Sequence, residues 1–183
     1  GPRNRGLRGV KLGPGSPRTR VGWADSRAPA NVSGRNLWPA IERHAVTRLT
    51  NDPADFPAEA LKGFIAANKR YVKPVYGGVA RSTFTPAGKV AVVYGGGSGH
   101  YPAFAGWVGH GFADGAVCGN IFSSPSAAQA YSVLKAVHRG AGVLMGFGNY
   151  AGDVLHFGQA IERLRAEGIE ADTLVVTDDI ASG

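Results

Sequence analysis

Residues 90–102 read VAVVYGGGSGHYP, and this stretch decides the fold. The apolar run Val90–Tyr94 is typical of a strand that is buried on both faces of a parallel sheet. The glycines that follow allow positive φ and leave backbone N–H groups uncovered, so a polar or phosphorylated ligand could approach closely. His100 then stands at the carboxyl end of the strand, where open α/β sheets place their ligands.

The glycine-rich segment does not match a known nucleotide-binding loop. It lacks the third glycine position of the dinucleotide fingerprint and the Gly-Lys-Ser/Thr ending of a P-loop. Two interpretations are therefore open on these residues alone: a ligand-binding loop, or a tight turn after a strand.

Composition places the chain among globular domains. It has 183 residues, 44% of them hydrophobic, which suits one domain with a buried core. The formal charge of +7 lies in residues 1–36, where eight Lys or Arg stand against one acidic residue, Asp25. The remaining residues carry equal numbers of both signs, so the folded part has no general attraction to nucleic acid.

Residues 1–36 are rich in Gly, Pro and Arg and poor in large apolar side chains, so we expect a disordered basic tail. An RNA- or DNA-binding arm is a weaker alternative, because such arms stack bases on aromatic rings and this segment holds only Trp23. A non-native extension or a wrongly assigned start is a further interpretation, since no Met opens the chain.

Cys118 is the only cysteine, which excludes an intrachain disulfide and fits a reducing cytoplasm. No apolar run reaches the roughly 18 residues that a membrane span requires. The N-terminus lacks the apolar core of a signal peptide. The sequence therefore predicts a cytoplasmic protein without a membrane partner, in which Cys118 is an inert packing thiol.

From residue 37 onward, predicted strands and helices alternate. This pattern predicts an α/β fold with a mostly parallel or mixed sheet flanked by helices on both faces. We expect helices at 37–49, 55–71, 102–108, 126–139 and 153–167, strands at 89–94, 115–122, 143–147 and 173–177, and an extended, glycine-interrupted segment at 74–84. The chain stops at Gly183, just past a strand end, so we expect residues 37–183 to be an incomplete domain.

A second polar cluster, GNYAGD at residues 148–153, follows another apolar strand. Asp153 falls in the first turn of a helix, where a carboxylate is stabilised by about 0.3–1 kcal/mol and needs no catalytic role. The alternative is a general base that faces His100 across a shared cleft, with each group changing the proton affinity of the other.

Four segments in this order resemble the dihydroxyacetone kinase family. They are GGGSGHYP at 95–102, AVCGNIFSSP at 116–125, NYAGDVLHF at 149–157 and VTDDI at 176–180. The resemblance spans roughly residues 51–182 and concerns the N-terminal part of the substrate-binding (DhaK) domain. An ordered set of motifs seldom arises by chance, so the four are more specific together than singly.

The resemblance implies a kinase that phosphorylates a terminal hydroxyl of a short-chain ketose. Position by position, Gly97, Ser98 and Gly99 would line the substrate. His100 would hydrogen-bond it and assist proton transfer, and Asp153 would act on the attacking hydroxyl. Phosphoryl transfer needs an aligned hydroxyl more than a strong nucleophile, so such a pair is adequate.

The resemblance also implies that the complete enzyme needs further parts. ATP and Mg would bind a separate helical domain or subunit, or a phosphorylated partner would donate the phosphoryl group. No cofactor or metal is therefore expected on this segment. The family holds its ketose as a hemiaminal on a histidine beyond the equivalent of Gly183, so we expect this chain to be inactive alone. The family commonly forms homodimers.

Two positions depart from the better-known dihydroxyacetone kinases. Gly148 stands where they have a lysine, which removes a charged donor from the pocket, and Tyr101 replaces an acidic residue. These changes resemble the branch of the family that acts on tetruloses such as erythrulose, so a longer ketose is expected as substrate.

A non-catalytic ketose-binding or regulatory module is the alternative function, because the family has relatives in transcriptional control. The remaining histidines are expected to be structural. His44, His138 and His156 fall on predicted helices, and His110 falls in a predicted turn between two glycines.

Overall fold

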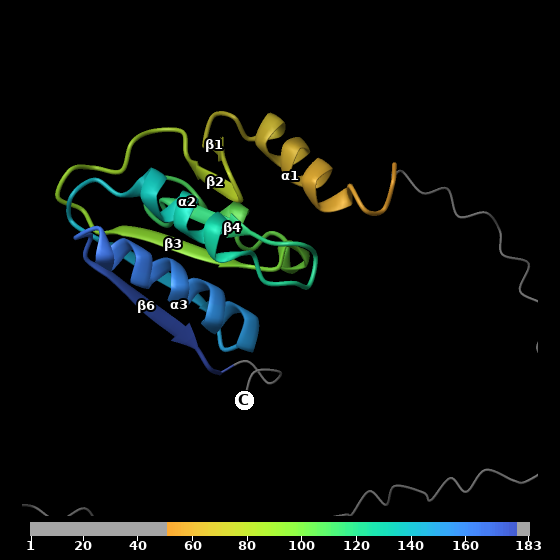
Figure 1. Cartoon of the computed structure of the whole chain (residues 1–183). Helices are drawn as coiled ribbons and strands as arrows, with labels where there is room; N and C mark the ends of the chain where they lie inside the picture. Colours follow the sequence, from red (N-terminus) through yellow and green to blue (C-terminus); the bar gives the residue numbers. More distant parts are fainter. Residues whose placement is uncertain (1–50, 179–183) are drawn as a thin grey trace, which may run out of the picture. The chain divides into compact units, whose positions relative to one another are not determined.

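The structure, a computed structural model, describes residues 51–178. The basic tail and the helix predicted at 37–49 lie outside the described residues. None of the helices in the described part is long and apolar enough to cross a bilayer. The elements follow in the order α1 (Phe56–Ala67), β1 (Val72–Val75), β2 (Gly78–Arg81), β3 (Ala91–Gly96), β4 (Gly115–Cys118), α2 (Ala127–Val137), β5 (Val143–Gly148), α3 (Ala151–Ala166) and β6 (Ala171–Val176), as Figure 1 shows.

The strands form one mixed sheet in the order β1-β2-β4-β3-β5-β6. β3, β4, β5 and β6 run parallel, whereas β1 and β2 form an antiparallel hairpin that pairs with β4. The predicted α/β class with a mixed sheet is confirmed, and the extended segment expected at 74–84 holds most of this hairpin. The chain passes from β3 to β4 on one side and then to β5 on the other, which creates a topological switch point at β3.

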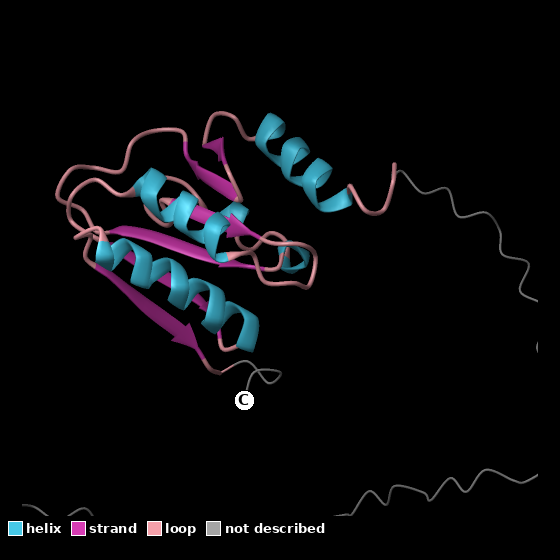
Figure 2. Cartoon of the chain, in the orientation of Figure 1, coloured by secondary structure: helices cyan, strands magenta, loops and turns pink. Residues whose placement is uncertain are grey.

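The two faces of the sheet carry separate hydrophobic cores. Neighbouring strand residues point to opposite faces, so Val117 packs with α2 and α3 while Ala116 and Cys118 pack with α1. The helices α2 and α3 lie side by side over one face (Figures 1 and 2). Right-handed crossovers explain this placement. The connections from β4 to β5, through α2, and from β5 to β6, through α3, run in the same direction across the sheet, so both helices lie on the same face. The connection from β3 to β4 runs in the opposite direction.

The helices begin where the sequence provides caps. Ser126 and Gln129 form a capping box at the start of α2, as the predicted cap at Ser126 requires. α3 begins at Ala151, earlier than expected, and buries Phe157 against Phe147 of β5 with ring centroids 4.8 Å apart. Burial of a side chain of this size contributes about 1.5–3 kcal/mol.

Three predicted elements differ from the structure. The helix expected at 55–71 ends at Ala67. The helix expected at 102–108 is wrong: this region holds only the short 3-10 turn Ala105–Trp107, and another short turn, Ser98–His100, precedes it. Gly106 and Gly109 disfavour a helix there, and the side chains of Phe104 and Trp107 are partly buried by packing against the core on this face of the sheet. The strand expected at 115–122 ends at Cys118, and the chain turns at Ile121 and Phe122.

Candidate functional site

Three loops meet at the carboxyl ends of the parallel strands, at the switch point beside β3. They follow β3, β4 and β5, and together they line a cavity of about 200 Å³. Its walls are Gly97, His100, Phe122, Ser123, Ser124, Tyr150 and Asp153. The structure therefore brings together Gly97, His100 and Asp153, which the sequence placed in three different roles on two separate loops.

A larger cavity of about 310 Å³ adjoins the first one. The two share Gly97, His100, Tyr150 and Asp153. The larger cavity extends over aromatic side chains, and its remaining walls are Tyr94, Gly96, Ala103, Phe104, Trp107, Phe147, Gly148 and Val176. A polar ligand at the shared wall could therefore place an apolar part against aromatic rings.

Asp153 is buried, with 6% of its surface exposed, and within the described residues its Oδ1 has no hydrogen-bond partner. Burial raises the pKa of this carboxyl, and a hydrogen bond with Ser124 and the charges of His156 and His100 only partly oppose the rise. A carboxylate that merely capped α3 would lie in solvent with an unraised pKa. The buried, unpaired oxygen instead fits a group that awaits a hydroxyl donor.

His100 ends the first 3-10 turn and is exposed at the wall of both cavities. Its ring stands edge-on to Phe104 and Phe122, with centroids 6.2 and 5.7 Å away. These contacts on both sides define the position of the imidazole. The charge of His100 lowers the pKa of Asp153.

Gly97 and Gly99 are needed for close approach and not for positive φ. A Cβ at Gly97 or at Gly99 would lie 2.6 Å from the carbonyl oxygen of Ile121, and neither has a positive φ. The N–H groups of Ser98 and Gly99 donate to the carbonyl oxygens of Asn120 and Ile121, at 2.9 and 2.7 Å. These two N–H groups are therefore paired, and the expectation that they are open to a ligand is wrong.

We expect Gly97→Ala to lower the free energy of unfolding by about 1–3 kcal/mol, the range for overpacking, because the new methyl group meets a backbone oxygen. Gly109→Ala is the control, since a Cβ there meets nothing within 4 Å. Urea denaturation of both variants measures the difference. Equal stability of the two would show that the loop following β4 can move away freely.

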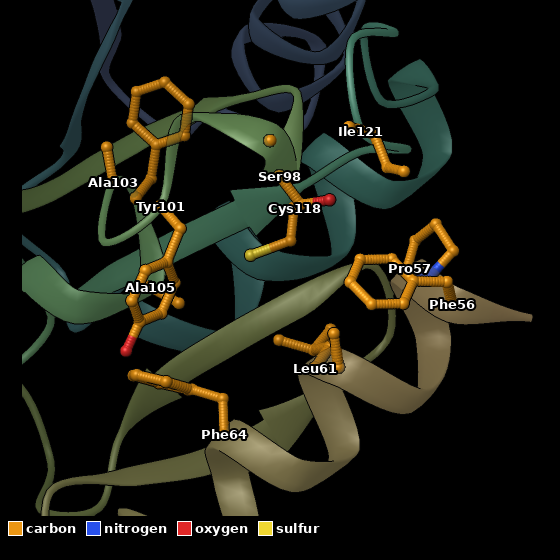
Figure 3. A pocket seen from close by; sticks show the side chains of 13 residues that line it. Phe56, Pro57, Leu61, Phe64, Ser98, Tyr101, Ala103, Ala105, Cys118 and Ile121 are labelled. Atoms are coloured by element: carbon orange, nitrogen blue, oxygen red, sulfur yellow. The ribbon is translucent and has the colours of Figure 1, made fainter. Parts of the chain in front are cut away.

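Ser98 and Gly99 line a third cavity, of about 370 Å³, on the other side of the loop. Figure 3 shows this cavity between α1, which provides Leu61 and Phe64, and the loop. The Sγ of Cys118 lies at its wall, and burial raises the pKa of this thiol to about 12. The thiol is thus un-ionised and suits the predicted packing role, and the apolar cavity offers no acid-base chemistry.

Two residues of the site were quoted in the sequence segments but not singled out. Ser124, after β4, hydrogen-bonds to Asp153, and a Cβ at Gly152 would lie 2.7 Å from its Oγ. Tyr150 is the N-cap residue of α3 and lines both shared cavities. Both residues lie within the segments FSSP and NYAGD, so the sequence indicated that they are near the site. Whether their side chains point into the cavity depends on how each loop turns, which the sequence does not show.

The residues of these cavities do not suit a metal ion or a nucleoside triphosphate. Between residues 51 and 178 there is no group of three or more His, Cys, Asp and Glu side chains that could hold a metal. In the same part of the chain, no Lys or Arg lines either shared cavity. Polyphosphate recognition usually requires cations of this kind.

Comparison with known proteins identifies the family. The sequence model of the Dak1 domain matches residues 62–183. The chain belongs to the Dak1 domain family. The L-erythrulose 1-kinase of Mycolicibacterium smegmatis is 61% identical over 137 residues, which cover 75% of this chain and 24% of that kinase. The resemblance to the dihydroxyacetone kinase family, inferred from the four segments, and to its erythrulose branch, inferred from Gly148 and Tyr101, is thereby confirmed.

Solved Dak1-type structures share the fold. The dihydroxyacetone kinase of C. freundii, also solved with AMP-PNP and Mg²⁺, matches with a TM-score of 0.68 and 35% identity over 73% of this chain and 26% of that one. A dihydroxyacetone kinase operon co-activator, Dha-DhaQ, matches with a TM-score of 0.64 and 33% identity over 68% of this chain and 38% of that one. The chain thus spans about a quarter of the length of the kinases it resembles.

Proposed function

We propose that this Dak1 chain forms the ketose-binding side of a kinase that phosphorylates a terminal hydroxyl of erythrulose or a similar short-chain ketose. The observation that carries the proposal is the position of Asp153: this residue lines cavities shared with His100, and its buried Oδ1 has no hydrogen-bond partner within the described residues. The similarity to erythrulose and dihydroxyacetone kinases supports this choice of substrate.

In this mechanism Asp153 accepts the proton of the attacking hydroxyl. Burial raises its pKa, which makes the ionised carboxylate a better base than an exposed one. His100 hydrogen-bonds the ketose from the opposite wall and assists proton transfer. Gly97 lets the substrate approach the backbone, while Ser98 and Gly99 hold the loop against the β4 loop through their paired N–H groups.

The larger cavity accounts for a preference for ketoses longer than three carbons. Gly148 is part of its wall, and a Cβ there would lie 3.0 Å from the ring of Tyr150. A long side chain at this position would displace that ring and fill the cavity. With glycine, the distal carbons of a tetrulose can lie against Phe104 and Trp107.

The phosphoryl donor is expected to arrive on a separate helical domain or subunit that binds ATP and Mg²⁺, or on a phosphorylated partner protein. The similarity to a dihydroxyacetone kinase that was solved with AMP-PNP and Mg²⁺, and to dihydroxyacetone-binding subunits of PTS-dependent kinases, supports this expectation. The proposal includes a cytoplasmic location and a homodimer. It also includes the expectation that this chain alone binds a ketose without phosphorylating it.

Calorimetric titration of the 183-residue chain with L-erythrulose, dihydroxyacetone and glycerol tests the proposal. We expect erythrulose to bind with a dissociation constant on the order of 1 mM. We expect glycerol, which lacks the carbonyl, to bind about tenfold more weakly. Chemical-shift changes at His100 and Asp153 locate the site. Equal binding of the three compounds, or shifts confined to other residues, would refute a ketose site here.

A regulatory module is the second candidate, because the chain also resembles the operon co-activator. Both candidates predict ketose binding, so turnover separates them. A protein that contains this chain, the rest of the substrate-binding domain and a nucleotide-binding helical domain or subunit should phosphorylate erythrulose with ATP and Mg²⁺. Binding without turnover under any donor would favour the regulatory alternative.

A further inference from the structure

His156 lies on α3 one turn after Asp153, and the mechanism above gives it no role. Its Nδ1 lies 2.8 Å from the carbonyl oxygen of Pro125. A carbonyl oxygen can only accept a hydrogen bond, so Nδ1 carries the proton and donates it. The bond joins α3 directly to the loop that follows β4.

The loop on the other end of this bond is tightly folded. Pro125 is fully buried. A Cβ at Gly119 would lie 2.3 Å from the carbonyl oxygen of Ser123 and 2.8 Å from the nitrogen of Pro125. Ser126 then begins α2 with its capping box. Because the turn is closed on itself and anchored to α2, the bond from His156 fixes the whole turn against α3.

Ser124 stands inside this turn, between the backbone of Gly152 and the carboxyl of Asp153. Its Oγ would be 2.7 Å from a Cβ at Gly152, and it hydrogen-bonds to Asp153. A shift of the turn by a few tenths of an ångström would therefore change this hydrogen bond directly. The imidazole of His156 also acts on Asp153 through its charge.

We propose that His156 is a positioning residue of this site: through Pro125 it holds the turn so that Ser124 stays hydrogen-bonded to Asp153. The titratable groups around Asp153 are His100 from the loop after β3, Tyr150 before α3, and His156 itself. His156 acts by position as well as by charge. The inference deepens the proposed function, but the geometry that carries it does not depend on a ketose.

The test follows the titration of the Asp153 carboxyl carbon by NMR in the 183-residue chain. Both the hydrogen bond from Ser124 and the charge of His156 lower the pKa of this carboxyl, so removing them should raise it further. His156→Leu removes both, and we expect the proton affinity of Asp153 to rise about tenfold, one pKa unit. His156→Asn keeps a donor at the Nδ1 position, so we expect a rise of about threefold.

His138→Leu is the matched control, because His138 lies at the end of α2 and its Nε2 accepts from the Gly140 N–H. It should leave the Asp153 titration unchanged. Equal shifts in His156→Leu and His156→Asn would show that charge alone acts, and an unchanged titration in His156→Leu would show no action at all; either result overturns the proposal.

A second measurement does not require any variant to fold. Long-range ¹⁵N spectra of the wild-type chain should show that Nδ1 of His156 keeps its proton when the ring is neutral. A neutral ring protonated at Nε2 would overturn the proposal. Neither measurement uses a ketose, so a chain that binds no ketose but shows both results would refute the proposed function and leave this inference standing.

Discussion

Replacement of Asp153 by Asn should lower the rate of ketose phosphorylation by about 10²–10⁴-fold, the range for loss of a general base. The amide has the shape of the carboxylate but cannot take a proton from the attacking hydroxyl. The assay needs a protein that contains this chain, the rest of the substrate-binding domain and a nucleotide-binding helical domain or subunit. Asp55→Asn, at the exposed start of α1, is the control and should keep full activity.

The same substitution should not reduce stability. Because burial raises the folded-state pKa of Asp153 above 3.8, the folded chain holds this proton more tightly than the unfolded chain does. Stability therefore falls as the pH rises through the folded-state pKa, and above that pKa the ionised, buried carboxylate opposes folding. Asp153→Asn removes that penalty, so urea denaturation at neutral pH should give equal or higher stability than wild type.

The pH dependence of turnover gives the result that would contradict the role of Asp153 as the base. In wild type, activity should be lost as the pH falls through the raised pKa of Asp153, because the protonated carboxyl cannot act as a base. The residual activity of Asp153→Asn should lack this acid limb. A variant with wild-type rates and an unchanged acid limb would show that another group is the base, and that Asp153 is a capping residue only.

The meeting of His100 and Asp153 could be predicted from the sequence for a topological reason. Both follow apolar runs that form parallel strands, and the carboxyl ends of parallel strands lie at one edge of the sheet. The pairing of β3 with β5 brings these two ends together. Two polar groups at strand ends therefore imply one shared site, even when a long segment separates them.

The contribution of the β4 loop could not be predicted in the same way. The apolar pattern continues to Phe122, which favoured a longer strand, yet Phe122 is 80% exposed. The strand ends earlier because the Asn120 side chain accepts a hydrogen bond from the Ile121 N–H and the chain turns. This turn places Ser124 beside Asp153. Neither the hydrophobic periodicity nor the composition of the segment predicts the position of the turn.

The second large effect concerns Asp114, at the other end of the sheet from the site. Its carboxylate is completely buried and accepts hydrogen bonds from Arg81 at 2.8 Å, from Lys89, and from the Val92 N–H at 2.9 Å. These partners lie on β2, before β3 and on β3. The Asp114 carboxylate therefore links the β1-β2 hairpin to β3 and to the segment before it.

Asp114→Ala should lower the free energy of unfolding by about 3–5 kcal/mol, because it leaves the Arg81 guanidinium buried without its partner. Urea denaturation measures this loss. Glu167→Ala is the control: Glu167 pairs with Lys135 on the surface, and exposed ion pairs contribute little. Arg81→Met added to Asp114→Ala should recover part of the stability, whereas strictly additive losses would contradict a coupled pair.

Acid denaturation distinguishes the stabilisation by this ion cluster from stabilisation by side-chain packing at the same position. Burial acts to raise the pKa of Asp114, but the hydrogen bonds from Lys89, Val92 and Arg81 and the charge of Lys89 outweigh it and hold the pKa below 3.8. Its stabilisation is therefore present above pH 3.8 and is lost as the pH falls through the lowered pKa. Asp114→Ala should lack this part of the acid decline. Parallel declines in wild type and variant would show that the carboxylate is not held ionised by its three partners.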